Sequence, residues 1–589
     1  MTTFTAIPIQ AKGGAFLIED RAPHEIYTAE DLNDEHLAIA RTIDQFWVNE
    51  VEPHLEAIRK QEPGVALQVL RKSAELGLTA IAIPERFGGM EMDFTSVMIS
   101  SLHLAKDASY GSWHSAHTGI GTLPVLFFGT EEQKQKYLPR LAKAELLAAY
   151  ALTEPLAGSD ALAIRTRADL SSDGKYYVLN GQKMWITNGG AADLFTVFAK
   201  VGGEKFTAFL VERSFPGVSS GAEEHKMGIK GSSTTAVYFD NVRVPVENVL
   251  GEVGRGHIIA FNILNIGRLK LGVGALGGAK KIFAICLKYA KERKAFGSVI
   301  AQFGAIQHKL AEMAIRTYAV ESMVWRAVGL IESELRQSAQ HEPAQSMTQL
   351  KAVEEYAAEC SIIKVYASEM LDFVVDEGVQ IHGGYGYHQD YAVEGAYRDS
   401  RINRIFEGTN EINRLLITGM LLKRAARNQL ELMPAVQSVL DTELVKIFST
   451  SGDEGTRLVS NAKKIALFAI GIAQKRFGAD LEKQQEVMMC ISDIVMEVFA
   501  MESTLLRTRK LAASSKGTNA ADMCAVFVQS AMDRIEISAR TVVGVCADDG
   551  TVHDKMATLR ALANYDPLDA VALRRNVARR LLAAGGYAV

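Results

Sequence analysis

The sequence predicts an α+β fold in which a β domain lies between helical domains. Apolar residues recur at helical spacing over residues 35–145, and over 146–250 they form short runs broken by Gly, Asn, Asp and Pro. Helical spacing then resumes at Gly256. This order of helices, strands and helices is typical of an α+β arrangement. The chain has 589 residues, 48% hydrophobic and 23% charged, which is enough for several domains with sizeable cores.

Five segments follow from these changes of pattern. They are a leader at 1–34, an N-terminal helical domain at 35–147, a middle β-barrel-like domain at 148–254, a C-terminal four-helix bundle at 255–426 and an appended helical domain at 427–589. The periodicity predicts helices at 36–51, 66–76, 94–104 and 131–141, strands at 148–152, 176–179, 195–198 and 207–211, and long bundle helices at 258–290, 307–334 and 348–379. Because the long helices are apolar over much of their surface, we expect them to bury a further face against another subunit.

The composition disfavours several classes of function. A net charge of -5 and a pI near 6.3 leave no basic surface for nucleic acid. We see no targeting segment and no run of about 18 apolar residues, so we expect a bacterial cytoplasmic protein. A disulfide framework and a metal site are both disfavoured because the five cysteines are scattered. These cysteines are Cys286, Cys360, Cys490, Cys524 and Cys546.

The appended segment carries no recognisable chemistry of its own. Its residues 462–477 combine Lys463, Lys464, Lys475 and Arg476 with apolar residues at helical spacing. This pattern predicts an amphipathic helix packed within the domain. Peripheral contact with a membrane, here the inner membrane, is the alternative that the basic residues leave open.

One short stretch places a carboxylate between apolar residues and a turn. Glu407 follows Ile405 and Phe406 and precedes Gly408 and Thr409. Burial against apolar side chains raises the pKa of a carboxyl group toward the value that a general base needs near neutral pH. Glu407 is therefore our candidate general base, and Thr409 is a candidate cap for the following helix. The alternative is an ordinary helix N-terminus with a dipole-stabilised acid.

Two polar stretches in the β segment suit a planar cofactor with a polar ring edge. The loop from Thr153 to Asp160 offers N–H and hydroxyl donors of the kind that a flavin pyrimidine needs. Further along, Trp185 and Thr187 alternate on a strand and so share a face, where an indole would cover one side of an isoalloxazine ring. Each stretch also fits an ordinary turn or a core tryptophan.

Two stretches of the third segment suit a pyrophosphate. Arg293 lies shortly before Phe296, and an arginine forms charge-assisted hydrogen bonds with phosphate oxygens. The Gly-Gly-Tyr-Gly stretch at 383–386 follows a predicted helix, and its glycines allow the backbone to approach a ligand closely. No strand precedes these glycines, so they are not a Rossmann fingerprint.

In order and spacing, these motifs resemble the acyl-CoA dehydrogenase family over about residues 35–422. The motifs that carry the resemblance are Thr153-Glu154-Pro155 with Gly158-Ser159-Asp160, Trp185-Ile186-Thr187, Arg293 with Phe296-Gly297, Gln380 with Gly383-Gly384, and Phe406-Glu407-Gly408-Thr409. The leader, the stretch 303–307 and the appended segment are similar to the very-long-chain branch. The resemblance implies FAD as cofactor, an acyl-CoA substrate, electron-transferring flavoprotein as electron acceptor and a homodimer.

The resemblance also implies roles for individual residues, with Glu407 as the catalytic base. Some relatives carry the base instead at the position that Gly267 occupies here, so its absence there supports Glu407. The residues implied for FAD binding are Thr153, Ser159, Trp185, Thr187, Arg293, Phe296, Gln380, Gly383, Gly384, Thr409 and Glu411. Those implied for acyl-CoA binding are Ser159, Asn265, Arg268, Phe406 and Gly408.

The implied reaction is the α,β-dehydrogenation of a long-chain acyl-CoA to a trans-2-enoyl-CoA in fatty-acid β-oxidation. Glu407 would remove the α-proton and flavin N5 would accept the β-hydride. Very-long-chain relatives carry Gly-x-x-Gly at the deep end of the acyl tunnel. Here Gly121 is followed by Pro124 in place of the second glycine, which is expected to shorten or reshape the tunnel. Two alternatives stay open, an oxygen-using acyl-CoA oxidase and an assembly or scaffold protein with residual dehydrogenase activity.

Overall fold

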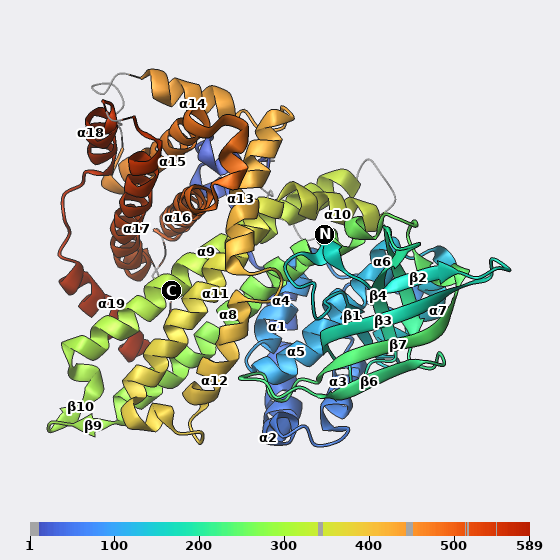
Figure 1. Cartoon of the computed structure of the whole chain (residues 1–589). Coiled ribbons are helices and arrows are strands. Elements are labelled where there is room, and N and C mark those ends of the chain that lie inside the picture. The colour runs from blue at the N-terminus through green and yellow to red at the C-terminus, as the bar shows by residue number, and fades with distance from the viewer. Residues whose placement is uncertain are drawn as a thin grey trace. The chain divides into compact units, whose positions relative to one another are not determined.

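The structure is a computed structural model that describes residues 11–339, 345–442, 452–512, 514, 517–548 and 550–588 (Figure 1). Residues 1–10 of the predicted leader lie outside the described residues, as do 340–344, 443–451, 513, 515–516, 549 and 589. The chain divides into two compact units. The sheet unit comprises Asn33–Gly278 with Leu335–Glu354, and the bundle unit comprises Met1–Leu32, Ala279–Glu334 and Glu355–Val589.

The sheet unit begins with a series of α-helices, among which α1, α4, α5 and α7 start at side-chain caps. Asn33 accepts a hydrogen bond from the backbone N–H of His36 at the start of α1, and Asp93 accepts one from Ser96 at the start of α4. Such caps satisfy backbone donors that a helix leaves unpaired at its first turn. These helices are α1 (Asp34–Phe46), α2 (Leu55–Arg59), α3 (Val65–Glu75), α4 (Phe94–Leu104), α5 (Ala108–Ala116), α6 (Leu123–Phe128) and α7 (Glu131–Ala142).

An eight-stranded sheet follows, with the order β6-β7-β3-β2-β4-β5-β8 and with β1 paired to β4. β1 and β2 run parallel to β4, and the other neighbouring strands are antiparallel. Inward-facing residues such as Phe195, Val197 and Phe209 form a buried core and confirm the predicted β domain. The strands are β1 (Ala148–Ala151), β2 (Arg167–Leu170), β3 (Tyr176–Thr187), β4 (Leu194–Val201), β5 (Lys205–Glu212), β6 (Val218–Glu223), β7 (Thr234–Pro245) and β8 (Val249–Leu250).

Long helices then return, as the sequence predicts. α8 (Gly256–Glu292) runs from the sheet unit into the bundle unit. Among the described helices it is the one long and apolar enough to cross a membrane, but 61% of its most apolar window is buried, as in a core helix. The other elements up to residue 426 are β9 (Lys294–Ala295), β10 (Ser298–Val299), α9 (Gly304–Ala339), α10 (Gln345–Glu355), α11 (Ala357–His382), α12 (Ala392–Ser400) and α13 (Asn410–Ala426).

The predicted helix at 348–379 is two helices in the structure. The chain leaves helical geometry at Tyr356, where φ is -105° and ψ is 28°, between α10 and α11. The buried Tyr356 ring donates a hydrogen bond from its hydroxyl to Ala11 O over 2.8 Å. Apolar periodicity continues through this break, and so the pattern alone does not reveal it.

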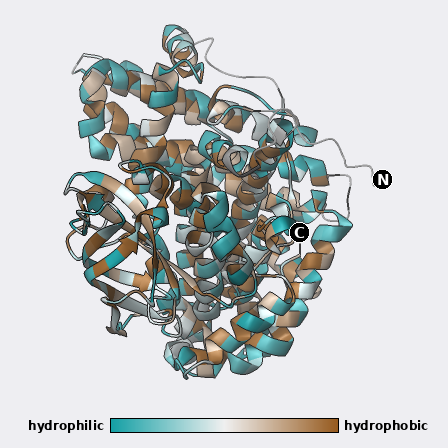
Figure 2. Ribbon diagram, turned by 90° about the vertical axis from the view of Figure 1, so that its right-hand side faces the viewer, coloured by the Kyte–Doolittle hydropathy of each residue, from teal (hydrophilic) through white to brown (hydrophobic). Residues whose placement is uncertain are grey.

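The appended helices pack onto one another. Ile465, Leu467, Phe468 and Ile470 of α15 are all buried, so this helix does not support the membrane-surface alternative. Figure 2 shows hydrophilic and hydrophobic segments alternating along the helices, as expected of amphipathic packing. The helices are α14 (Leu432–Asp441), α15 (Glu454–Phe477), α16 (Gln485–Leu511), α17 (Gly517–Cys546), α18 (Val552–Ala563) and α19 (Ala570–Ala584).

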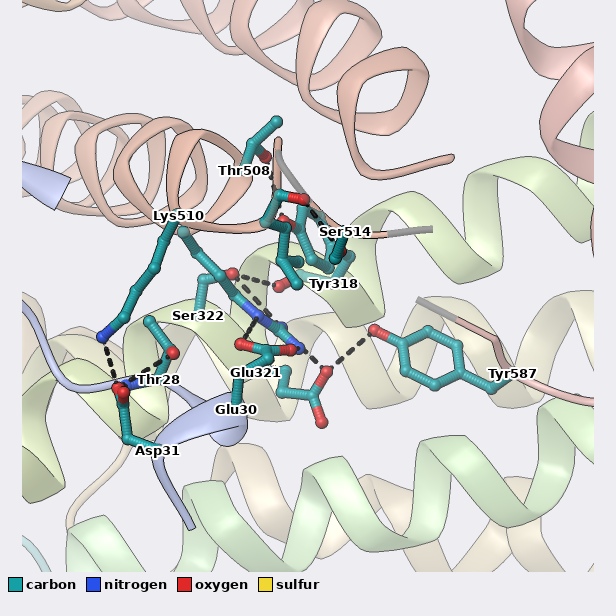
Figure 3. Close-up of polar contacts among 12 residues, drawn as sticks. Thr28, Glu30, Asp31, Tyr318, Glu321, Ser322, Thr508, Lys510, Ser514 and Tyr587 are labelled. Carbon is teal, nitrogen blue, oxygen red and sulfur yellow. Dashed lines mark hydrogen bonds and ion pairs between the residues drawn. The ribbon is translucent and has the colours of Figure 1, made fainter. Parts of the chain in front are cut away.

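The described part of the leader, residues 11–32, packs against the appended helices through ion pairs. Asp20 pairs with Lys463 over 2.9 Å, and Asp31 pairs with Lys510 over 2.6 Å. Figure 3 shows the centre of this contact, where Glu30 and Glu321 converge between α9 and α16. Both carboxylates bind the buried Arg507, over 2.7 and 2.8 Å. Residues 11–32 are thereby an integral part of the bundle unit.

Candidate functional site

The loop that follows β1 is held by a buried ion pair. Glu154 and Lys183 are both buried, and their charged groups lie 2.7 Å apart. The Glu154 carboxylate also accepts hydrogen bonds from the backbone N–H of Arg165 and from the N–H and hydroxyl of Thr166. Because all these donors favour the charged form, the pKa of Glu154 is lowered despite its burial. The arrangement fixes the start of the Thr153 loop, whereas Ser159 near its end is exposed.

Trp185 sits in a bulge of β3. Two residues lie between Lys183 and Ile186, opposite a single residue of the partner strand β7, so β3 carries one extra residue here. The φ of Trp185 is 59°, a left-handed value that a residue with a Cβ rarely adopts, and 54% of its surface is exposed. The bulge interrupts the simple alternation that the sequence predicts, although Ile186 is buried and Trp185 and Thr187 both lie outside the core. An exposed indole held in a strained conformation is available to stack on a planar ligand.

Asn265 and Arg268 come together on the first half of α8. Arg268 donates a hydrogen bond from Nη1 to Asn265 Oδ1 over 2.8 Å, and both side chains are nearly buried. Residues three apart on a helix share a face, which explains the contact. The pair is a fixed donor group in the segment where acyl-CoA contacts are predicted.

The Gly121 segment is a single turn of π-helix, His117–Gly121, at the end of α5. A side chain at Gly121 would lie 2.8 Å from the Ala148 side chain, so only glycine fits there. Pro124 is buried in α6. His117 is neutral, because burial lowers its pKa to about 4 and its two ring nitrogens bond to Leu141 O and to the Ala148 N–H.

In the bundle unit, a hairpin and a glycine turn form a second group. The hairpin of β9 and β10 turns at Phe296 and Gly297, which have φ values of 50° and 79°, and Phe296 is 96% exposed. The Arg293 guanidinium lies 5.3 Å from the centre of the Tyr385 ring, which follows Gly384. The contact brings the predicted arginine to the predicted glycine turn.

The glycine turn leaves room for a ligand. Gly383 has φ 60° and ψ -138°, a conformation for glycine only, and no atom lies within 4 Å of where a Cβ of Gly383 or Gly384 would be. Gln380 is exposed on the last turn of α11. An arginine, an exposed aromatic ring and an open glycine backbone are the groups that a dinucleotide requires.

Glu407 lies in a turn immediately before α13. Its φ is 57°, and that of Gly408 is 81°. Thr409 caps α13 by accepting a hydrogen bond from the backbone N–H of Ile412 over 3.3 Å, as predicted. The preceding Ile405 and Phe406 are 47% and 39% exposed, so the apolar burial expected from them is incomplete in this chain.

Comparison with known proteins covers nearly the whole chain. Family models match at 33–145 (acyl-CoA dehydrogenase, N-terminal domain), 149–242 (middle domain), and 254–422 and 461–561 (two C-terminal domain models). A Bacillus subtilis (strain 168) protein described as a probable acyl-CoA dehydrogenase is 46% identical over 98% of both chains. The chain belongs to the acyl-CoA dehydrogenase family.

Two further relatives of this acyl-CoA dehydrogenase are informative. The crystal structure of a Bacillus anthracis acyl-CoA dehydrogenase complexed with FAD is 45% identical, covers 98% of this chain and all of its own, and has a TM-score of 0.96. The human very long-chain specific acyl-CoA dehydrogenase is 42% identical over 63% of this chain and 57% of its own length. FAD is the cofactor of the enzyme. The open glycine turn beside Arg293 fits its pyrophosphate.

Sequence reasoning missed three supporting residues of this dehydrogenase. Lys183 holds the Thr153 loop through Glu154, Tyr385 contacts Arg293, and Lys364 contacts the Glu407 turn. A lone lysine inside an apolar run, as at Lys364, is a signal that was available from the sequence, because a buried ammonium requires partners. The identity of those partners depends on the fold.

Proposed function

We propose that this chain catalyses the α,β-dehydrogenation of a fatty acyl-CoA, with Glu407 as the base that removes the α-proton. The observation that carries the proposal is the backbone at Glu407, which is left-handed and continues into a left-handed Gly408. Such a conformation is costly for glutamate and persists where the surrounding structure imposes it. A carboxylate presented in this way is fixed in direction, as a general base must be.

The α-proton of a thioester is too weakly acidic for a free carboxylate, so donors must stabilise the enolate as it forms. We assign one such donor to the backbone N–H of Glu407 itself, directed at the thioester carbonyl. Arg268 and Asn265 orient the acyl-CoA, together with Ser159, Phe406 and Gly408. FAD, when bound, supplies the hydride acceptor for the β-carbon.

The residues proposed to hold FAD divide between the two units. In the sheet unit, Thr153 and Ser159 offer polar groups and Trp185 offers a ring face, with Thr187 beside it. In the bundle unit, Arg293 and the residues around it would contact the pyrophosphate and adenosine of FAD. The bundle-unit set is Arg293, Phe296, Gln380, Gly383, Gly384, Thr409 and Glu411. The 96% exposure of Phe296 supports a contact outside its own subunit, and we propose a homodimer in which it reaches the partner's FAD.

We propose a long-chain substrate, electron-transferring flavoprotein as acceptor and a place in fatty-acid β-oxidation in the cytoplasm. The similarity to very long-chain specific relatives supports the chain-length class. The buried Pro124 in place of a glycine supports a tunnel shorter than theirs.

An anaerobic titration tests the proposal. Purified holoenzyme is mixed with acyl-CoAs of increasing chain length while the flavin absorption band is followed, for wild type, Glu407→Gln and the exposed control Glu431→Gln. We expect long-chain substrates to bleach the flavin in wild type and control, and the variant Glu407→Gln to be slower by roughly 10²- to 10⁴-fold. If no acyl-CoA bleaches the wild-type flavin, the proposal fails. Rapid aerobic turnover without an added acceptor would indicate an oxidase instead.

A further inference from the structure

Lys364 stands out among the groups that the proposed reaction does not use. It lies in the middle of α11, in a run of apolar residues, and its side chain is fully buried. Burying an ammonium group is costly unless it is bound by acceptors, so its partners are informative. Two of its partners, Gly408 and Asn410, lie in or next to the turn that carries Glu407.

Lys364 donates two hydrogen bonds that straddle Thr409. One runs from Nζ to the carbonyl oxygen of Gly408 over 2.8 Å, and the other to Asn410 Oδ1 over 2.6 Å. Hydrogen bonds from a charged donor are shorter and about twice as strong as those between neutral groups. Lys364 therefore fastens the backbone immediately after Glu407 to α11.

The Gly408 carbonyl also accepts a second hydrogen bond. Asn413 Nδ2 approaches it to 2.8 Å, and it approaches the Thr409 carbonyl to 3.0 Å. With both lone-pair directions occupied, the plane of the peptide that joins Gly408 to Thr409 is fixed. A fixed plane here stabilises the left-handed conformation of Gly408 and, through it, that of Glu407.

The opposite side of the turn is anchored by a second set of contacts. Asn410 Nδ2 donates to Ser368 Oγ over 3.1 Å and to Glu369 Oε1 over 2.9 Å. Glu369 also binds Arg414 through both carboxylate oxygens, over 2.8 and 2.9 Å. Asn410 is thus held independently of Lys364, and loss of the lysine would free the Gly408 side of the turn in particular.

We propose that Lys364 is the positioning residue for the general base. It holds the Gly408 carbonyl so that Glu407 keeps the left-handed backbone that directs its carboxylate and its N–H at the substrate. The proposal rests on the proposed function, because it assumes that Glu407 removes the α-proton. The alternative is that Lys364 only fills and stabilises the interior of the bundle unit.

The test compares Lys364→Met with Lys463→Met in the FAD-loaded enzyme. Lys463 of the appended domain is also a buried lysine, bound to Glu502 over 2.5 Å and to Asp20 of the leader over 2.9 Å. It therefore controls for the loss of a buried ammonium. Steady-state kinetics with a long-chain acyl-CoA, FAD content and the α-deuterium isotope effect are measured for both. For Lys364→Met we expect kcat to fall roughly 10- to 100-fold with KM within about threefold, as for a misplaced catalytic group.

The isotope effect separates positioning from general loss of structure. If Lys364 positions the base, α-proton removal becomes more rate-limiting in Lys364→Met and the isotope effect rises, whereas Lys463→Met keeps the wild-type isotope effect. Equal kinetic losses in the two variants, or an unchanged kcat in Lys364→Met, would overturn the proposal. If Lys364→Met does not fold, Asn413→Ala removes the second donor to the same carbonyl and must show the same selective loss of kcat.

Glu407→Gln is measured alongside to distinguish two failures. If Glu407→Gln keeps wild-type activity, the assignment of the base is wrong and the role of Lys364 falls with it. If Glu407→Gln is inactive while Lys364→Met and Asn413→Ala are fully active, the base stands and only the positioning role is refuted.

Discussion

Arg507 of α16 donates two hydrogen bonds to the Glu30 carboxylate, over 3.1 and 2.7 Å, from a position 477 residues later in the chain. Arg507 is buried, so Glu30 supplies one of the charges that make its burial tolerable. We expect Glu30→Gln to lower the free energy of unfolding by about 1–3 kcal/mol, because a buried cation loses part of its compensation. Urea unfolding checks this, with the exposed Glu482→Gln as control. Equal midpoints in the two variants would contradict it.

Glu321 gives the same cluster a pH dependence (Figure 3). Burial alone would raise the pKa of Glu321, but Lys280 and Arg507 lower it to about 2 from an ordinary value of 4.5. A carboxyl with a lowered pKa in the folded state contributes stability above its unfolded pKa and loses it as pH falls through the folded value. We expect the stability difference between wild type and Glu321→Gln to shrink as pH falls from 4.5 toward about 2. Denaturant unfolding at several pH values measures it, and a difference that does not change with pH would contradict the assignment.

Trp185 allows its ring and its backbone to be tested separately. Because its φ of 59° suits glycine, Trp185→Gly removes the indole without straining the backbone. We expect the apoprotein to be at least as stable as wild type and FAD to bind roughly tenfold more weakly, through loss of the stacked ring. FAD affinity is followed by flavin fluorescence, with Trp185→Phe as the variant that retains an aromatic face. If Trp185→Gly binds FAD with wild-type affinity, the indole does not contact the cofactor.

Gly383 and Gly384 form a matched pair. Both have open space where a Cβ would be, but only Gly383 has a positive φ, of 60°. We expect Gly384→Ala to leave the melting temperature of the apoprotein unchanged and to weaken FAD binding, because its methyl group would occupy the ligand's space. Gly383→Ala should lower both the melting temperature of the apoprotein and its affinity for FAD, since it also adds backbone strain of about 1–2 kcal/mol. If Gly384→Ala binds FAD normally, the pyrophosphate lies elsewhere.

Much of this fold follows from the sequence because its patterns of apolar residues extend over long segments. The apolar periodicity of α8 and α9 and the Gly- and Pro-broken strands establish the order of helices, strands and helices. The break at Tyr356 does not follow from the sequence because periodicity persists through it, and the Tyr356 hydroxyl bonds to Ala11, which lies far away in the chain. Local pattern carries no information about such a partner.

In the candidate site, too, some features follow from the sequence and others depend on the fold. Thr409 as a helix cap follows from motif chemistry, and the structure confirms that contact. The contact of Arg293 with Tyr385 in the glycine turn comes from the structure alone. The bulge at Trp185 does not follow, because the pairing with β7 decides it. Lys364 meets Gly408 across 44 residues, and only the packing of α11 against α13 brings them together.

α11 sets the separation between two groups of proposed functional residues in the chain. Lys364 on this helix donates a hydrogen bond to the turn that carries Glu407. Gly383, directly after the end of the helix, lies in the open turn proposed for the pyrophosphate. At a rise of 1.5 Å per residue, the helix separates them by roughly 28 Å along its axis. One residue inserted between Lys364 and Gly383 would shift one of them by about 1.5 Å along the axis and rotate it by about 100° relative to the other. We therefore expect insertions or deletions between these two positions to impair the proposed activity, however mild their effect on the stability of the helix.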